Sequence, residues 1–133
     1  MAVKIDCTNY TLVQNTGTLV TAIATDSDTT TLLITPTVSC NKLILILLNT
    51  AAGAVTVDIA KGDFWAGKAM TQVSLAQNVP KAFCFESAKS MEWEADVAGT
   101  TFAYRIKVTI AAAAVTTSYQ VIQLPSVESK VKK

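Results

Sequence analysis

The chain has 133 residues, a formal net charge of +1 and no histidine. A chain of this length is expected to form one domain with a single core. A net charge so close to zero gives no long-range field that attracts nucleic acid or an anionic membrane, so we expect neither among its partners. Histidine is the commonest general base, and its absence removes most catalytic triads and metal-hydrolase sites. We therefore predict that the chain is not an enzyme and has no catalytic residues.

Half of the residues are hydrophobic, and Thr and Val are abundant, as is typical of β-strands. The longest apolar runs, residues 43–48 and 110–115, are far shorter than the roughly 20 residues that cross a bilayer. The N-terminus lacks the apolar stretch of a secretory signal, which favours a protein that stays in the cell that makes it. Cys7, Cys40 and Cys84 are odd in number and lack a histidine partner, so we predict reduced, mostly packed thiols.

The first third of the chain is polar, with short apolar pulses separated by residues that favour turns, and it predicts three strands. We expect residues 1–14, with Tyr10 and Leu12, to form an N-terminal strand or arm. A β-sandwich domain is then expected over residues 15–124. Residues 125–133 are expected to form a flexible basic tail.

Residues 42–49 are apolar on both faces, which is typical of a central strand. The second apolar face of such a strand must be covered, and association with another subunit is the simplest way to cover it. We therefore predict Leu43, Leu45 and Leu47 as subunit-interface residues. Residues 55–59 then alternate strictly between apolar and polar, which predicts a hairpin with the preceding strand.

The segment that follows breaks this alternation and places two aromatic residues, Phe64 and Trp65, between Gly62 and Gly67. One interpretation is an exposed loop whose rings contact a partner, since aromatic residues dominate binding hot spots. The other is that the rings fold back and cap one end of the sandwich.

Alternation resumes in the second half of the chain. Residues 91–97 place three acidic side chains on one face of a strand. The strongest strand pattern, residues 101–110, carries Arg105 and Lys107 on one face, where they can lie across from the acidic row. A last strand is predicted at residues 119–124. About eight or nine short, mostly antiparallel strands with little or no helix predict an all-β chain with a β-sandwich or jelly-roll-like fold.

Acidic residues offer the remaining candidates for chemistry. Glu92 and Glu94 share a strand face, and glycosidases use two acids that flank a bond, but carboxylates two positions apart are more often a solvated face. Asp58 and Asp63 offer oxygen ligands without the loop of six or more oxygens that calcium needs. We predict no metal and no cofactor.

The order and spacing of several segments carry a family resemblance. They are the strand LILILLNT, the turn AAGA, the strand VTVDIAKGD, a strand ending in VPKAFCFESAKSM, and the final VIQLP. With these segments, residues 42–124 resemble the small bacteriophage capsid decoration (cement) proteins, which have a β-sandwich or jelly-roll-like fold.

The resemblance implies a non-enzymatic virion protein that is made in the host cytoplasm and binds the exterior of an assembled capsid. Its partner is then the shell of major capsid protein, which it stabilises against internal DNA pressure, commonly as a homotrimer near three-fold positions. The N-terminal segment suits addition of a strand to a neighbour. On this reading Tyr10, Leu12, Phe64 and Trp65 are the predicted capsid or partner contacts.

Two other functions stay open at this point. A carbohydrate- or receptor-binding module would use Phe64, Trp65 and Trp93 as a platform for sugar rings. A phage tail or head-tail connector subunit could share the same fold, because sandwiches host many functions.

Overall fold

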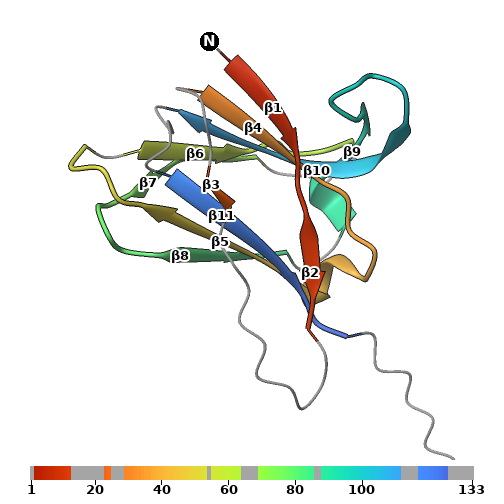
Figure 1. Ribbon diagram of the computed structural model, residues 1–133. Helices are drawn as coiled ribbons and strands as arrows, with labels where there is room; N and C mark the ends of the chain where they lie inside the picture. The colour runs from red at the N-terminus through yellow and green to blue at the C-terminus, as the bar shows by residue number, and fades with distance from the viewer. Residues whose placement is uncertain are drawn as a thin grey trace, which may run out of the picture.

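The computed structural model describes residues 2–12, 23–24, 29–53, 55–63, 69–85, 88–111 and 117–125. Within these ranges the chain forms strands β1 to β11, arranged in two facing sheets (Figure 1). The only helical elements there are two 3-10 turns, η1 (Cys40–Lys42) and η2 (Ala88–Ser90). The predicted all-β class with a sandwich of two sheets is confirmed. The described strands outnumber the expected eight or nine, and two pairings are parallel.

The first sheet, sheet A, is built around the longest strand. Its order is β1 (Ala2–Asp6), β4 (Thr29–Ile34), β10 (Phe102–Ala111), β6 (Val55–Ile59) and β7 (Met70–Leu75), with β9 (Met91–Ala95) also on β10. Ile106 of β10 pairs with Ile34 on one side and with Met91 on the other. Strand β9 therefore continues the line of β6 along the same side of β10.

The second sheet, sheet B, has β5 near its centre. Its order is β2 (Asn9–Thr11), β11 (Thr117–Gln123), β5 (Leu43–Asn49) and β8 (Lys81–Cys84), with β3 (Ile23–Ala24) also on β11. The predicted hairpin between residues 42–49 and 55–59 is wrong, because β5 and β6 lie in different sheets. The alternation of apolar and polar residues shows which face of a strand is buried, but it does not show which strand lies beside it.

A buried asparagine shapes the connection from β5 to β6. The Asn49 amide donates to the carbonyl oxygens of Gly53 at 2.9 Å and Leu75 at 3.3 Å. Its side-chain oxygen accepts from the Ala51 backbone N–H at 3.0 Å. These bonds satisfy backbone groups at the point where the chain leaves sheet B for sheet A, so the Asn-Thr ending of the apolar strand has a structural role.

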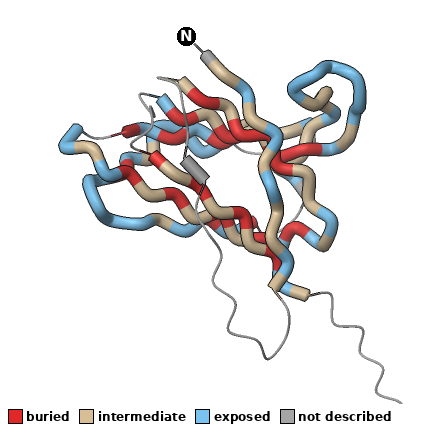
Figure 2. The backbone as a smooth tube through the Cα atoms, viewed as in Figure 1, coloured by how far each residue is buried: buried red, intermediate tan, exposed pale blue. Residues whose placement is uncertain are grey.

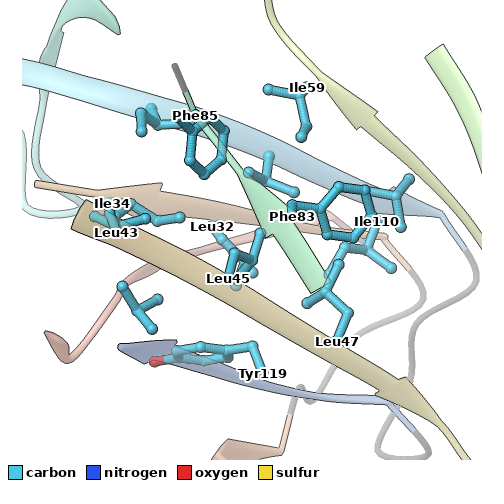
Figure 3. Close-up of a cluster of buried hydrophobic side chains, with 14 of the residues drawn as sticks. Leu32, Ile34, Leu43, Leu45, Leu47, Ile59, Phe83, Phe85, Ile110 and Tyr119 are labelled. Atoms are coloured by element: carbon cyan, nitrogen blue, oxygen red, sulfur yellow. The ribbon is translucent and has the colours of Figure 1, made fainter. Parts of the chain in front are cut away.

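The core fills the space between the sheets, where side chains from both inner faces meet (Figure 3). Leu43, Leu45 and Leu47 have no exposed surface there and pack with residues of sheet A such as Leu32 and Ile110. The three leucines predicted at a subunit interface thus lie inside their own chain. The outward side chains of the same strand are Ile44, Ile46 and Leu48, each partly buried.

The N-terminal segment closes one side of the sandwich by joining both sheets (Figure 1). Strand β1 runs parallel to β4 in sheet A, and β2 runs parallel to β11 in sheet B. Between them, the Cys7 N–H donates to Leu33 at 3.0 Å and the Thr8 N–H donates to the Tyr119 hydroxyl at 3.4 Å. The predicted arm, as far as it is described, pairs with its own chain.

The three cysteines are free. Burial raises the pKa of the Cys7 thiol to about 12, so it stays protonated and unreactive at neutral pH. Cys40 is also buried. Cys84, in contrast to the expected packing, is exposed on the outer side of β8.

Candidate functional site

The outer face of sheet B carries no charged side chain at the positions that point outward from β2, β11, β5 and β8. We call this surface the neutral face. One row of paired residues crosses all four strands, because Ile122 pairs with both Tyr10 and Ile44, and Ile44 pairs with Cys84. Paired residues point to the same side of a sheet. The face comprises Tyr10, Ile44, Ile46, Leu48, Ala82, Cys84, Ser118, Gln120 and Ile122.

The neutral face continues at one end with Leu12 and Leu124, which are tied to it through backbone bonds. The Leu12 N–H donates to Gln123, and the Leu124 N–H donates to Lys42. Two of the predicted contact residues, Tyr10 and Leu12, therefore lie on or beside this face. Lys42, immediately before β5, is the charged residue nearest to that strand in the sequence.

The outer face of sheet A has the opposite character. Lys107 of β10 forms ion pairs with Glu92 at 3.3 Å and Glu94 at 3.2 Å, and Lys4 of β1 contacts Glu94 at 3.5 Å. The hydrogen bond from Lys107 lowers the pKa of Glu94. Burial opposes the charge on Lys107, but the bond to Glu94 and the charge of Glu92 outweigh it and raise the pKa of its amino group. The two glutamates thus serve a network of ion pairs.

Arg105 lies opposite Glu92 in the strand register, as predicted, but its guanidinium bonds groups other than the acidic side chains. Its side chain is 7% exposed and donates to the backbone oxygens of Glu94 and Thr101, each at 3.0 Å, and to the Thr35 hydroxyl. The predicted pairing of basic with acidic residues across β9 and β10 is therefore confirmed for Lys107.

A second candidate surface lies on the β9–β10 hairpin, which projects beyond the end of β4 (Figure 1). Trp93, Phe102 and Tyr104 are 56%, 53% and 50% exposed. The ring centroids of Trp93 and Phe102 are 6.2 Å apart with an interplanar angle of 19°, and those of Trp93 and Tyr104 are 5.1 Å apart at 64°. We call these three residues the aromatic ledge.

The ledge is the outward continuation of the core side of sheet A. Along β10, Phe102 and Tyr104 are in phase with the fully buried Ile106. Trp93 pairs with Tyr104 across the hairpin and shares its face. Figure 2 shows how this strand passes from buried residues to an exposed tip. A face with the sequence pattern of a core is thus open to solvent.

A glycine and an aspartate hold the start of this hairpin in place. Gly62 has a φ of +81°, and a Cβ there would lie 2.5 Å from the Lys89 carbonyl oxygen and 2.6 Å from that of Met91. Only glycine fits such a close approach. The Asp63 N–H donates to Met91 at 2.9 Å, and its carboxylate accepts from the Trp93 N–H at 2.7 Å. The Gly-Asp pair of the sequence motif therefore positions the ledge.

The predicted site residues are distributed unevenly over these surfaces. Tyr10 and Leu12 lie at the neutral face, whereas Phe64 and Trp65 lie outside the described residues. The structure groups Trp93 with Phe102 and Tyr104, which share one face of the alternating strand pattern with Ile106 and were not predicted as site residues. The only signal that could have singled them out is a concentration of three aromatic residues within two adjoining strands.

The described ranges contain no group of three or more Cys, Asp or Glu side chains arranged to hold a metal ion. They also contain no helix with the length and apolar character needed to span a membrane. Comparison of the chain with family models, with curated proteins and with solved structures finds no match.

Proposed function

We propose that the chain is a non-enzymatic decoration protein that binds the outer surface of an assembled phage capsid and stabilises it. The observation that carries this proposal is the unequal character of the two outer faces. Sheet A presents ion-paired lysines and glutamates, whereas the outward positions of sheet B are uncharged. The sequence resemblance supplies the capsid as the partner.

The neutral face suits docking against a protein because little charge must be dehydrated. Burying apolar surface contributes about 25 cal/mol per Å², whereas burying an unpaired charge costs several kcal/mol. With normal strand spacings, the seven residues of β5 span about 24 Å and the four strands about 20 Å across, and the shorter strands β2 and β8 make the surface smaller than this rectangle. Such a surface gives a modest contact, and repetition over a symmetric lattice would add avidity.

Self-association belongs to the same proposal. A homotrimer on the capsid exterior places several neutral faces against the shell at once, so that each copy raises the effective concentration of the others. In this proposal the protein is synthesised in the host cytoplasm and then binds the assembled shell.

The test mixes labelled protein with expanded capsids and with unexpanded procapsids, and measures co-sedimentation and the number of copies bound per shell. We expect saturable binding to the expanded form at a copy number set by lattice symmetry. Ile46→Lys places a charge in the neutral face and should abolish binding. Thr56→Lys adds the same charge on the exposed side of β6, in the other sheet, and should leave binding unchanged.

Absence of binding to either form of the shell would refute the proposal, as would equal binding by the two lysine variants. Rings or tubes of the purified protein in negative-stain microscopy would point instead to a tail or connector subunit.

A further inference from the structure

We propose that the aromatic ledge is a carbohydrate-binding site for short, uncharged oligosaccharides. This site lies on Trp93, Phe102 and Tyr104 of the β9–β10 hairpin and is separate from the neutral face that the proposed function uses. The inference therefore does not depend on the capsid-binding role.

The size of the ledge favours a small ligand over a protein. A large aromatic side chain has about 150–250 Å² of surface, so three rings that are about half exposed offer roughly 300 Å². A stable protein interface needs about 800 Å² from each partner. An oligosaccharide of a few units needs no more than the ledge provides.

The chemistry of the ledge matches that of a sugar ring. The C–H face of a pyranose is apolar and stacks on an aromatic face, while its hydroxyl groups need hydrogen-bond partners at the edge. Trp93 and Phe102 present two nearly parallel rings, and Tyr104 stands at an angle to them. The other residues on this face of the hairpin, Met91, Ala95 and Ile106, are uncharged, which favours neutral sugars over sulfated or sialylated ones.

Polar groups for the sugar hydroxyls stand beside these rings. The Trp93 indole N–H and the Tyr104 hydroxyl have no hydrogen-bond partner among the described residues, so both are free to bond a ligand. Asp63 uses one carboxylate oxygen for the Trp93 backbone N–H. Its other oxygen is available as an acceptor next to the ledge.

The ledge is also held in one arrangement before any ligand binds. Its residues lie on paired strands, and Gly62 and Asp63 fix the start of β9 against the end of β6. The contacts between rings further restrict their rotation. A binding surface that is already ordered loses little conformational entropy on association, which allows a small contact area to give measurable affinity.

The experiment titrates the full chain with cellotetraose, chitotetraose and maltotetraose, and follows binding by calorimetry and by tryptophan fluorescence. A Trp65→Phe background makes Trp93 the only indole reporter. We expect at least one of the three sugars to bind and to shift the Trp93 emission. Trp93→Ala and Phe102→Ala should each weaken binding about tenfold or more.

Val79→Ala is the matched control, because Val79 is 53% exposed and lies on the segment between β7 and β8. It should bind like the unchanged chain, and thermal unfolding of each variant verifies that it folds. Failure of all three sugars to bind at millimolar concentration would overturn the inference, as would binding that survives Trp93→Ala. Capsid co-sedimentation by Trp93→Ala separates the two proposals. Retention is expected, whereas its loss would assign the ledge to a protein contact.

Discussion

Among the described residues, Gln123 stands out because its side chain accepts two hydrogen bonds and donates two. It is 1% exposed, and its oxygen accepts from the Asn9 amide at 3.2 Å and from the Thr37 N–H at 2.9 Å. Its amide donates to the hydroxyl groups of Thr11 at 3.1 Å and Thr37 at 2.7 Å. One side chain on β11 therefore ties β2 and the segment after β4 together.

We expect Gln123→Leu to lower the free energy of unfolding by about 1–3 kcal/mol, because it removes the four hydrogen bonds that the buried Gln123 side chain makes to Asn9, Thr11 and Thr37, whose freed groups are partly open to water. Urea unfolding measures this loss. Gln77→Leu serves as the control, since Gln77 is exposed and makes one bond to Thr50 at 3.2 Å. Equal losses in the two variants would show that the Gln123 network contributes little.

Among the elements, the β9–β10 hairpin has two unlike faces. The aromatic ledge occupies one, and the ion pairs of Lys107 with Glu92 and Glu94 occupy the other. Because Lys107 lies on β10 and both glutamates lie on β9, the ion pairs join the two strands. Lys4 extends the same network to β1.

The lowered pKa of Glu94 makes this contribution dependent on pH. A carboxyl group whose pKa falls on folding stabilises the native state above its unfolded pKa, and the effect is lost as the pH drops through the folded value. We expect Lys107→Met to cost about 0.5–1 kcal/mol at pH 7, a modest value because the pairs are partly open to solvent, and less at pH 3.

Urea unfolding at the two pH values tests this dependence. Lys61→Met replaces an exposed lysine outside this network and should show no comparable pH-dependent loss. A cost of Lys107→Met that is the same at pH 3 and pH 7 would contradict an electrostatic role.

Strand positions were predictable where one face of a strand is buried. β5, β6 and β10 follow their alternating residues closely, and the ion pairing of Lys107 followed from the charges on adjoining strands. The pairing of β5 was not predictable, because its partner β11 lies far along the chain. An N-terminal strand or arm was expected over residues 1–14, but its division into β1 in sheet A and β2 in sheet B was not, because both pair with strands far along the chain.

The aromatic ledge shows a further limit of such prediction. Phe102 and Tyr104 continue the pattern of the buried residues of β10 without interruption. They are exposed because the core between the two sheets ends at Ile106, and the hairpin extends beyond this point and beyond the pairing with β4. The exposure of these residues depends on how far neighbouring elements extend, which cannot be read from the local sequence pattern.

In the molecule as a whole, residues that stabilise the core alternate along a strand with residues that are proposed to bind a partner. Leu45 is fully buried between the sheets, while Ile46 points outward into the neutral face. The same strand therefore supplies the core with one set of side chains and a partner with the other.

We expect Leu45→Ala to lower the free energy of unfolding by about 2–5 kcal/mol through loss of buried surface and the cavity it leaves. Ile46→Ala should cost about 1 kcal/mol or less, since that side chain is already partly exposed, yet it should weaken capsid binding. Denaturant unfolding and co-sedimentation of both variants separate these effects. Equal destabilisation by the two substitutions would mean that the outer face is packed as tightly as the core.

The N-terminal segment that joins both sheets has a consequence for how the protein is made. Within it, β2 pairs with β11, and Asn9 bonds Gln123, 114 positions later in the chain. During synthesis, β2 must therefore wait for β11 before the two can pair. Contacts so distant in sequence slow folding. Until β11 has been synthesised, β2 and β5 lack the strand that lies between them, so their edges stay open to pairing with other chains.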